Sequence, residues 1–285
     1  MTATFDGLVD DAALFPPGDA PMAASVPAHA RLRAELGNLV GPFVVPAGRL
    51  DELVDVLGDG APGDAGLPVS LIAAAADLPG AVARVAQVPG VRLAAVEVPG
   101  VADGAEWRRA ARDAAGAGHR TPLDGVPADV PAYVELPRTA ARDDLLDALA
   151  ATGTRAKLRT GGLRADLFPT PAELADTITA CVRRGVPFKC TAGLHAALPH
   201  TDLATGFAHH GFLTVLLAAH AAATGGDPEA WLREHDADEV VAGLRGADLP
   251  RARAAFTSFG TCSVLEPVAD LRALGLLPSP DRITA

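Results

Sequence analysis

The chain has 285 residues, 49% of them apolar, which is enough for one large hydrophobic core. Its formal net charge of −11 argues against nucleic acid or an anionic membrane surface as the main partner, and no apolar run is long enough to span a bilayer. Three cysteines without a CxxC pair, and an N-terminus without an apolar export segment, predict a cytoplasmic protein with free thiols; a homodimer is compatible with this composition.

Short β-branched or apolar runs alternate with longer helical patterns along the whole chain. Eight runs are predicted as strands, namely Leu8–Leu14, Phe43–Pro46, Val69–Ala73, Leu93–Val98, Ala132–Leu136, Arg155–Arg159, Pro187–Thr191 and Ala255–Gly260. Helical patterns between them include Leu50–Leu57, Trp107–Ala115, Asp143–Ala151 and Glu173–Arg184. This alternation predicts βαβ units and a parallel sheet. Eight strands in this length favour an α/β, single-domain (β/α)8 TIM barrel over residues 1–285, with an N-terminal helical segment.

Two features refine the helical part of this prediction. Thr170, Pro171 and Glu173 combine a threonine cap, a proline at the first helical position and a glutamate three residues after the cap, which is typical of a helix start. From His195 to Arg253 the pattern is mostly helical, which is more than one barrel helix requires. The excess predicts a small helical cap over one face, after the seventh strand.

Lysine is rare in this chain, which has 2 lysines and 22 arginines. Arginine can replace lysine wherever a positive charge is enough, but its guanidinium does not deprotonate and cannot serve as a neutral amine. Lys157 and Lys189 are therefore candidates for amine chemistry. The alternative is that both are residual surface charges.

Lys157 lies in the predicted strand Arg155–Arg159, and Lys189 lies in Pro187–Thr191. Each lysine alternates with apolar neighbours, which suit the side of a barrel strand that faces the helices. Both lysines are therefore predicted to point into the barrel. Each is close to the carboxyl end of its strand, the end where barrel enzymes carry their active sites.

Two inward amines on adjacent strands would disfavour double protonation, which leaves one amine nucleophilic near neutral pH. Such an amine could form a Schiff base with a carbonyl substrate. In the alternative arrangement each lysine simply pairs with a carboxylate, and Glu97 and Glu135 are the obvious partners. Asp10 could also orient a lysine.

Several motifs resemble deoxyribose-phosphate aldolase. They are Lys-x-x-Thr-Gly at Lys157–Gly161, Phe-Lys-x-x-x-Gly at Phe188–Gly193, and a Phe-Gly turn within Ser258–Ser263. A helix opened by Thr-Pro-x-Glu separates the first two, and the 32-residue interval between the lysines is similar to that of the family. Upstream, Leu8-Val9-Asp10 and the acidic residue before a proline in Ala95–Pro99 resemble the family more weakly.

The resemblance implies a cofactor-independent class I lyase of the aldolase type, which makes or breaks a C–C bond next to the carbonyl of a small anionic substrate. It implies that Lys157 is the Schiff-base nucleophile, that Lys189 keeps Lys157 neutral enough to react, and that Glu97 moves protons through a water. Gly162 stands in place of a basic residue of the family, and His195 in place of a small one. These departures favour a substrate that is not phosphorylated or that carries other substituents.

A set of polar residues and glycines at strand ends is predicted to contact the substrate. Its members are Asp10, Glu135, Arg159, Thr160, Gly161, Gly162, Thr191, Gly193, His195, Gly260 and Ser263. Backbone N–H groups at the glycines could hold an anion; the alternative is that the tight turns alone require glycine there. Arg159 could clamp an anionic substrate or form a salt bridge at the rim, and His195 could contact substrate or act as an acid–base group.

No metal or nucleotide cofactor is predicted. His195, His200, His209 and His210 form a loose group without the ligand spacing of a metal motif, and neither a GxGxxG nor a Walker loop is present. Two other functions stay open. The lysines could act only by charge in an isomerase, decarboxylase or cyclase, or the barrel could bind a small anion without catalysis.

Overall fold

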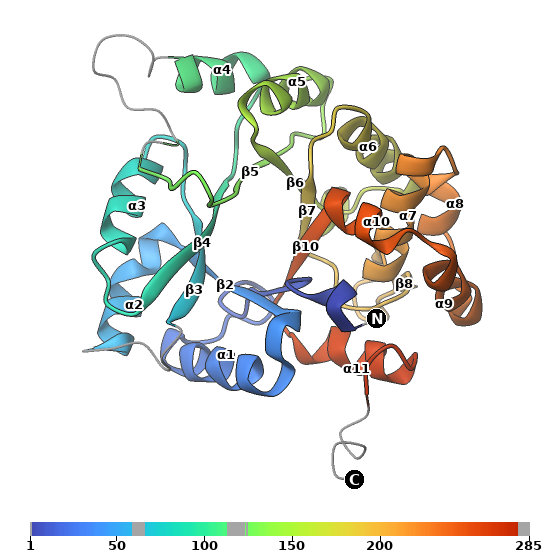
Figure 1. The fold of residues 1–285 in the computed structure, drawn as a ribbon, viewed down its shortest axis with the longest axis horizontal. Coiled ribbons are helices and arrows are strands. Elements are labelled where there is room, and N and C mark those ends of the chain that lie inside the picture. Colours follow the sequence, from blue (N-terminus) through green and yellow to red (C-terminus); the bar gives the residue numbers. More distant parts are fainter. Residues whose placement is uncertain (1, 59–65, 113–122, 124, 279–285) are drawn as a thin grey trace.

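The computed structural model describes residues 2–58, 66–112, 123 and 125–278. Eight parallel strands close into a barrel in the order β1-β10-β7-β6-β5-β4-β3-β2, with helices around the outside (Figure 1). The barrel strands are β1 Val9–Asp11, β2 Val40–Pro46, β3 Leu67–Ile72, β4 Val91–Val98, β5 Ala132–Glu135, β6 Arg155–Arg159, β7 Phe188–Thr191 and β10 Phe256–Thr261. The predicted α/β barrel is confirmed, and all eight predicted strands are present.

Each barrel strand is followed by a helix that packs outside it. The helices are α1 Met22–Leu36, α2 Leu50–Leu57, α3 Leu78–Val85, α4 Gly104–Arg112, α5 Arg142–Thr152, α6 Pro171–Arg183, α7 Phe212–Thr224, α8 Pro228–Leu232, α9 Ala237–Gly246, α10 Leu249–Ala255 and α11 Leu265–Ala273. Short 3-10 turns lie at Thr2–Phe5, Gly37–Leu39, Ala47–Arg49 and Ala165–Leu167, and the first of these is the predicted N-terminal helical segment.

The start of α6 forms as its sequence predicts. The Thr170 hydroxyl accepts a hydrogen bond from the backbone N–H of Glu173 at 3.2 Å, and the Glu173 carboxylate accepts one from the Thr170 backbone N–H at 2.7 Å. This reciprocal cap satisfies two backbone donors that have no partner within the helix. It fixes the residue at which α6, the helix after the strand of Lys157, begins.

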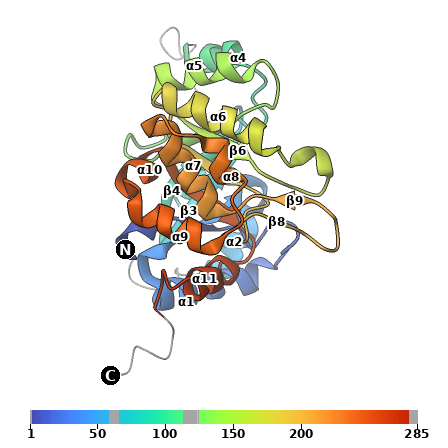
Figure 2. The ribbon, with the colours of Figure 1, turned by 90° about the vertical axis from the view of Figure 1, so that its right-hand side faces the viewer.

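The helices predicted after the seventh strand are present, and they pack mainly beside α7. Helices α8, α9 and α10 pack outside the barrel against α7, while a short hairpin of β8 His200–Thr201 and β9 Ala208–His209 lies at the end opposite the N-terminus (Figure 2). The reason lies in α7, where nine of 13 residues are buried. A helix that is apolar on all sides needs cover on its outer face as well as from the strands.

The apolar core lies between the strands and the helices, whereas the barrel interior is polar. On the outer side of the strands, Phe188 stacks on Phe256 and Phe212 stacks on Phe259, with ring centroids 5.5 and 4.9 Å apart. Inside the barrel, the buried polar side chains are Asp10, Ser70, Glu97, Lys157, Lys189 and Ser258. Within the described residues, no helix is both long and apolar enough to cross a membrane.

Candidate active site

The two lysines point into the barrel from adjacent strands at the same height. Lys157 on β6 and Lys189 on β7 are register partners, and they are only 3% and 2% exposed. Their strand neighbours, such as Leu158 and Cys190, belong to the apolar core on the outer side. Strand alternation therefore gives the inward direction of both amines, as the sequence predicts.

Glu97 on β4 joins the two amines across the barrel. Its Oε2 lies 3.1 Å from the Nζ of Lys157, and its Oε1 lies 2.7 Å from the Nζ of Lys189. The Ser70 hydroxyl donates a third hydrogen bond to Oε1 at 2.7 Å. Burial alone would raise the pKa of this carboxyl, but the two lysine charges and the hydrogen bonds outweigh it and hold the pKa well below its ordinary value.

Lys189 has a second carboxylate partner. The Oδ2 atom of Asp10 on β1 lies 2.6 Å from its Nζ and also accepts a hydrogen bond from the Ser258 hydroxyl at 2.8 Å. Burial would lower the pKa of Lys189, but Asp10 and Glu97 raise it above the ordinary lysine value. Burial also raises the pKa of the Asp10 carboxyl, against the opposing effect of Lys189.

This arrangement corrects the expectation that the two amines face each other directly. The Glu97 carboxylate contacts both amines, so Lys157 and Lys189 are coupled through a shared anion rather than by bare repulsion. The alternative considered for the sequence, that each lysine pairs with a carboxylate, is confirmed in its geometry. Lys189 is accordingly a protonated cation at neutral pH.

Glu135 lies beside Lys157 on the neighbouring strand, and Arg159 lies two residues further along β6, where solvent reaches the site. The Oε2 atom of Glu135 is 3.3 Å from the Nζ of Lys157, and its Oε1 accepts a hydrogen bond from Arg159 Nε at 2.8 Å. The Glu135 and Arg159 side chains are 15% and 34% exposed. Of the two roles considered for Arg159, the salt bridge is the one that the structure shows.

The glycine turns after β6 and β7 pack against each other. A Cβ added to Gly161 would lie 2.8 Å from the Cα of Gly193, and one added to Gly193 would lie 2.9 Å from the Cα of Gly161. Gly193 also has a φ of +79°, which favours glycine. Thr160 donates from its hydroxyl to the carbonyl of Thr191 at 3.3 Å. Close packing therefore explains these glycines, and an anion cradle stays a prediction.

The remaining predicted residues lie around β10. His195 Nδ1 is 2.8 Å from the Glu266 carboxylate of α11 and 3.2 Å from the Thr261 hydroxyl, which in turn bonds to the backbone of Ser263. Gly260 is the register partner of Asp10. Among the described residues, neither His195 nor Ser263 joins the ion network of the lysines, so their contact with substrate stays a prediction. The same holds for Gly162, which packs against Leu167.

Sequence reasoning missed three polar members of the interior. Ser70 and Ser258 hold the carboxylates, and the ring of Tyr133 lies 5.3 Å from the Nζ of Lys189. The sequence could have indicated Ser70, because it is the single hydroxyl residue in the apolar run Leu67–Ile72. A lone polar residue in a buried strand indicates a polar interior.

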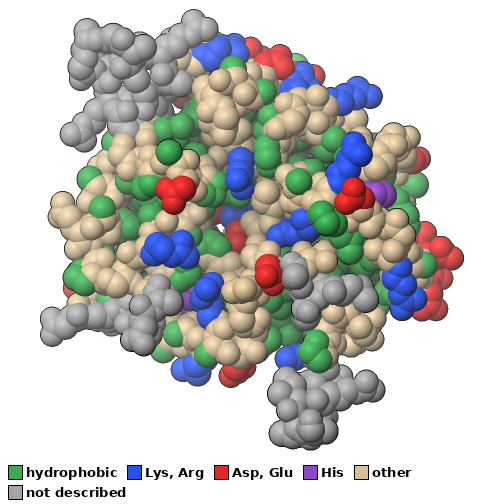
Figure 3. Space-filling view, in the orientation of Figure 1, with side chains coloured by type: hydrophobic (Ala, Val, Ile, Leu, Met, Phe, Trp, Pro, Cys, Tyr) green, Lys and Arg blue, Asp and Glu red, His purple; other side chains and the backbone are tan. Residues whose placement is uncertain are grey.

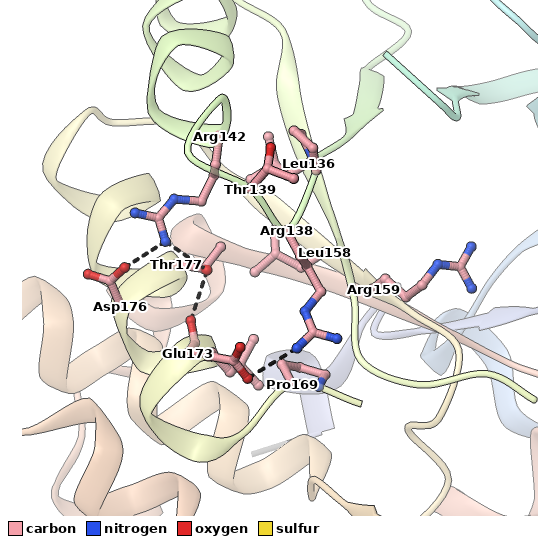
Figure 4. A pocket seen from close by; sticks show the side chains of 12 residues that line it. Leu136, Arg138, Thr139, Arg142, Leu158, Arg159, Pro169, Glu173, Asp176 and Thr177 are labelled. Atoms are coloured by element: carbon pink, nitrogen blue, oxygen red, sulfur yellow. Dashed lines mark hydrogen bonds and ion pairs between the residues drawn. The ribbon is translucent and has the colours of Figure 1, made fainter. Parts of the chain in front are cut away.

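Two cavities lie beside the barrel rather than within it. One, of about 300 Å³, lies between α5 and α6, where Arg138 pairs with Glu173 and Arg142 with Asp176, while Arg159 extends away from both pairs (Figure 4). The other, of about 580 Å³, adjoins the β8–β9 hairpin and is lined by aromatic and histidine side chains.

The histidines around the second cavity do not form a metal site. In the part of the chain that the structure describes, no three His, Cys, Asp or Glu side chains are arranged to hold a metal ion. His209 instead bonds to the Gly193 carbonyl at 3.0 Å, and His210 bonds to the Pro169 carbonyl at 2.8 Å. Burial lowers the pKa of both imidazoles.

Neither protein-family models nor curated protein sequences match this chain. Among solved structures, RipC from Yersinia pestis has 10% identity and a TM-score of 0.37, over 85% of this chain and 91% of that protein. The citrate lyase beta subunit from M. tuberculosis, complexed with oxaloacetate and magnesium, has 16% identity and a TM-score of 0.38, over 82% of this chain and all of that chain. Similarity this low carries no inference about activity, and the fold assignment depends on the closed barrel itself. No comparison points to deoxyribose-phosphate aldolase, so that resemblance depends on the sequence motifs alone.

Proposed function

We propose that the chain is a cofactor-independent class I lyase, which makes or breaks a C–C bond beside the carbonyl of a small anionic substrate, with Lys157 as its Schiff-base nucleophile. The observation that supports this most is the Glu97 carboxylate, which contacts both lysine amines inside the barrel. A buried amine beside a buried proton carrier is what Schiff-base chemistry needs.

Lys157 is the better nucleophile candidate of the two. Lys189 has two carboxylates at 2.6 and 2.7 Å, which hold it as a cation. Lys157 has longer contacts of 3.1 and 3.3 Å, and it shares both of its carboxylates with another cation. Glu97 is shared with Lys189, and Glu135 with Arg159. Lys157 is also the lysine beside the partly exposed pair, where a substrate would enter.

In the proposed reaction the neutral amine of Lys157 attacks the carbonyl carbon, and its proton passes to Glu97 or to water. The carbinolamine loses water and becomes an iminium. A base then takes the proton of the hydroxyl on Cβ, the Cα–Cβ bond breaks, and the Cβ fragment leaves as an aldehyde or ketone while the electron pair of that bond passes to the iminium and forms an enamine. The resulting enamine takes up a proton, and water then hydrolyses the iminium to free the amine. Lys189 remains a cation throughout and balances the charge of Glu97.

Arg159 has a role in this proposal because of its position. Its side chain is 34% exposed and its counterion, Glu135, also contacts Lys157. A carboxylate or phosphate group on the substrate could take the place of Glu135 at the guanidinium and form two parallel hydrogen bonds there. Substrate binding would then release Glu135 toward the amine of Lys157.

Exchange of α-protons with D2O tests the proposal without knowledge of the second substrate. Acetaldehyde, acetone, pyruvate and dihydroxyacetone serve as donors, and NMR follows the loss of their α-proton signals. We expect exchange of at least one donor by the wild-type protein and none by Lys157→Arg. Arg164→Lys is the matched control, because it adds an exposed lysine in place of an exposed arginine and should change nothing. Wild-type exchange no faster than that of Lys157→Arg would contradict the proposal.

A second candidate function follows from the ion pairs themselves. Because carboxylates keep Lys189 charged and contact Lys157, both lysines could act by charge alone, stabilising an enolate in an isomerase, decarboxylase or cyclase. Arginine keeps that charge. Lys157→Arg with a substantial part of the wild-type exchange rate would therefore favour this candidate over the Schiff base.

A further inference from the structure

Four arginines surround the amino-terminal mouth of the barrel, at the end opposite the predicted substrate entrance. They are Arg33 near the end of α1, Arg92 on β4, Arg155 on β6 and Arg253 on α10, and they lie close to the starts of four different barrel strands. Figure 3 looks onto this end, where the N-terminal segment and α10 lie, and shows several Lys and Arg side chains, with a few Asp and Glu side chains among them, around a central hollow. The two lysines of the chain are buried. The exposed cations are therefore arginines.

The strand register turns two of these arginines toward the barrel axis. Ser70 faces inward and pairs with Ala95, whereas Val69 pairs with Leu93, so β4 contains one extra residue at this point. This bulge makes Arg92 the partner of Pro68, which lies on the same inner face as Ser70. Arg155 lies two residues before the inward Lys157 and therefore also faces inward.

Neutral groups hold three of the guanidinium groups in place. Arg33 Nη1 donates to the Val40 carbonyl at 2.7 Å, and Arg253 donates to the carbonyls of Phe256 and Asp6 at 2.8 and 2.9 Å. Arg155 donates to the Tyr133 hydroxyl at 3.0 Å. These bonds fix the positions of the cations without neutralising them.

Direct ion pairs do not neutralise this cluster within the described residues. None of its four arginines forms an ion pair there, whereas other arginines do, such as Arg49 with Glu52 at 2.7 Å. Burial lowers the pKa of Arg253, and the negative charges of Asp10 and Asp6 oppose this effect. The carboxylates inside the barrel are, however, also paired with the cations Lys157, Lys189 and Arg159. Burial, and next the positive charge of Arg92, lowers the pKa of Arg33, which indicates that these two cations repel each other.

We propose that this mouth binds a compact oxyanion with two or more negative charges, of the kind presented by linked phosphates or by several carboxylates. A guanidinium is planar and offers paired N–H donors that match the oxygens of both groups. Four such groups around one hollow, in a chain whose net charge is −11, concentrate positive potential where the protein as a whole would repel an anion. The lysine cluster takes no part in this site.

Isothermal titration calorimetry at constant ionic strength tests the proposal with inorganic pyrophosphate and citrate as probes. We expect saturable binding of at least one probe by the wild-type protein. Arg92→Gln and Arg155→Gln should each weaken it on the order of tenfold, the usual effect of losing a charged hydrogen bond. Arg92 is exposed, so its variant should fold even if that of Arg155 does not.

Arg164→Gln is the matched control, since it removes one exposed arginine elsewhere. Preference for pyrophosphate would assign the site to phosphates, and preference for citrate to carboxylates. The proposal is overturned if neither probe binds saturably at millimolar concentration, or if Arg164→Gln weakens binding as much as Arg92→Gln. The measurement reads binding without turnover, so its outcome is independent of the proposed lyase activity.

Discussion

Replacement of Glu97 by glutamine removes one negative charge from the barrel interior and keeps the shape of the side chain. Glu97 is 1% exposed and accepts hydrogen bonds from Lys157, Lys189 and Ser70. In Glu97→Gln, two buried ammonium groups share fewer anions, and one of them faces an amide N–H₂ group. Loss of one partner from a buried ion pair costs about 3–5 kcal/mol of the free energy of unfolding.

The upper end of this range has a physical limit. An unpaired lysine can lose its proton, and neutralising an ordinary lysine at pH 7 costs about 5 kcal/mol, at 1.36 kcal/mol for each pH unit. Lys189 keeps Asp10 at 2.6 Å, whereas Lys157 keeps only the longer contact with Glu135 at 3.3 Å, which Glu135 shares with Arg159, so the loss should fall mainly on Lys157. We therefore expect Glu97→Gln to reduce the free energy of unfolding by about 3–5 kcal/mol at neutral pH.

Urea unfolding followed by circular dichroism measures this change. Glu52→Gln is the matched control, because it makes the same chemical change in an exposed pair with Arg49, where no measurable effect is expected. A loss below about 1 kcal/mol in Glu97→Gln, the range of surface pairs, would refute the reasoning that Asp10 and Glu135 cannot replace Glu97 as the partner of the buried lysines.

Three further predictions follow from the geometry. Gly41→Ala should reduce the free energy of unfolding by about 1–3 kcal/mol, because the added Cβ would overlap the Asp10 carboxylate. Gly48→Ala places its Cβ in open space and should have little effect, so equal urea midpoints for the two variants would contradict this prediction. The carboxylates raise the pKa of Lys189 in the folded protein, and this adds stability that is complete below the ordinary lysine pKa of 10.5 and is lost as the pH rises toward the raised pKa. Urea midpoints should therefore fall from about pH 9 to about pH 11, and a rise over this range would contradict the assignment. Thr170→Ala should reduce the free energy of unfolding by about 1 kcal/mol because the cap of α6 is lost, whereas Thr170→Ser should retain most of the capping stability. Thermal unfolding measures both variants, and equal losses would contradict the role of the hydroxyl as a cap.

Local sequence patterns predict much of this barrel because they act within one strand or one helix. The alternation of Lys157 and Lys189 with apolar neighbours fixes the direction of both amines before any contact is known. The Thr170 cap is equally local. The extra helices after β7 were harder, since a helical pattern shows that helices form but not which surface they cover.

The partners of the lysines depend on closure of the barrel. Lys189 and Asp10 lie 179 residues apart, and they meet because β1 and β7 both neighbour β10. The inward direction of Arg92 depends on one extra residue in β4, which only the register between strands reveals. Such contacts follow from the relative heights of distant strands, and no local pattern encodes those heights.

The central claim, that Lys157 is the nucleophilic amine, is tested most directly by reductive trapping. Lys157, Lys189 and the terminal amine are the primary amines of this sequence, so a peptide mass map can assign every adduct. Native protein is incubated with a donor that it exchanges and with cyanoborohydride, while a urea-unfolded sample shows that both lysines can be labelled. We predict an adduct on Lys157 in the native protein and none there in Lys157→Arg. Adducts confined to Lys189 or the terminal amine, in protein that still exchanges the donor, would contradict the claim.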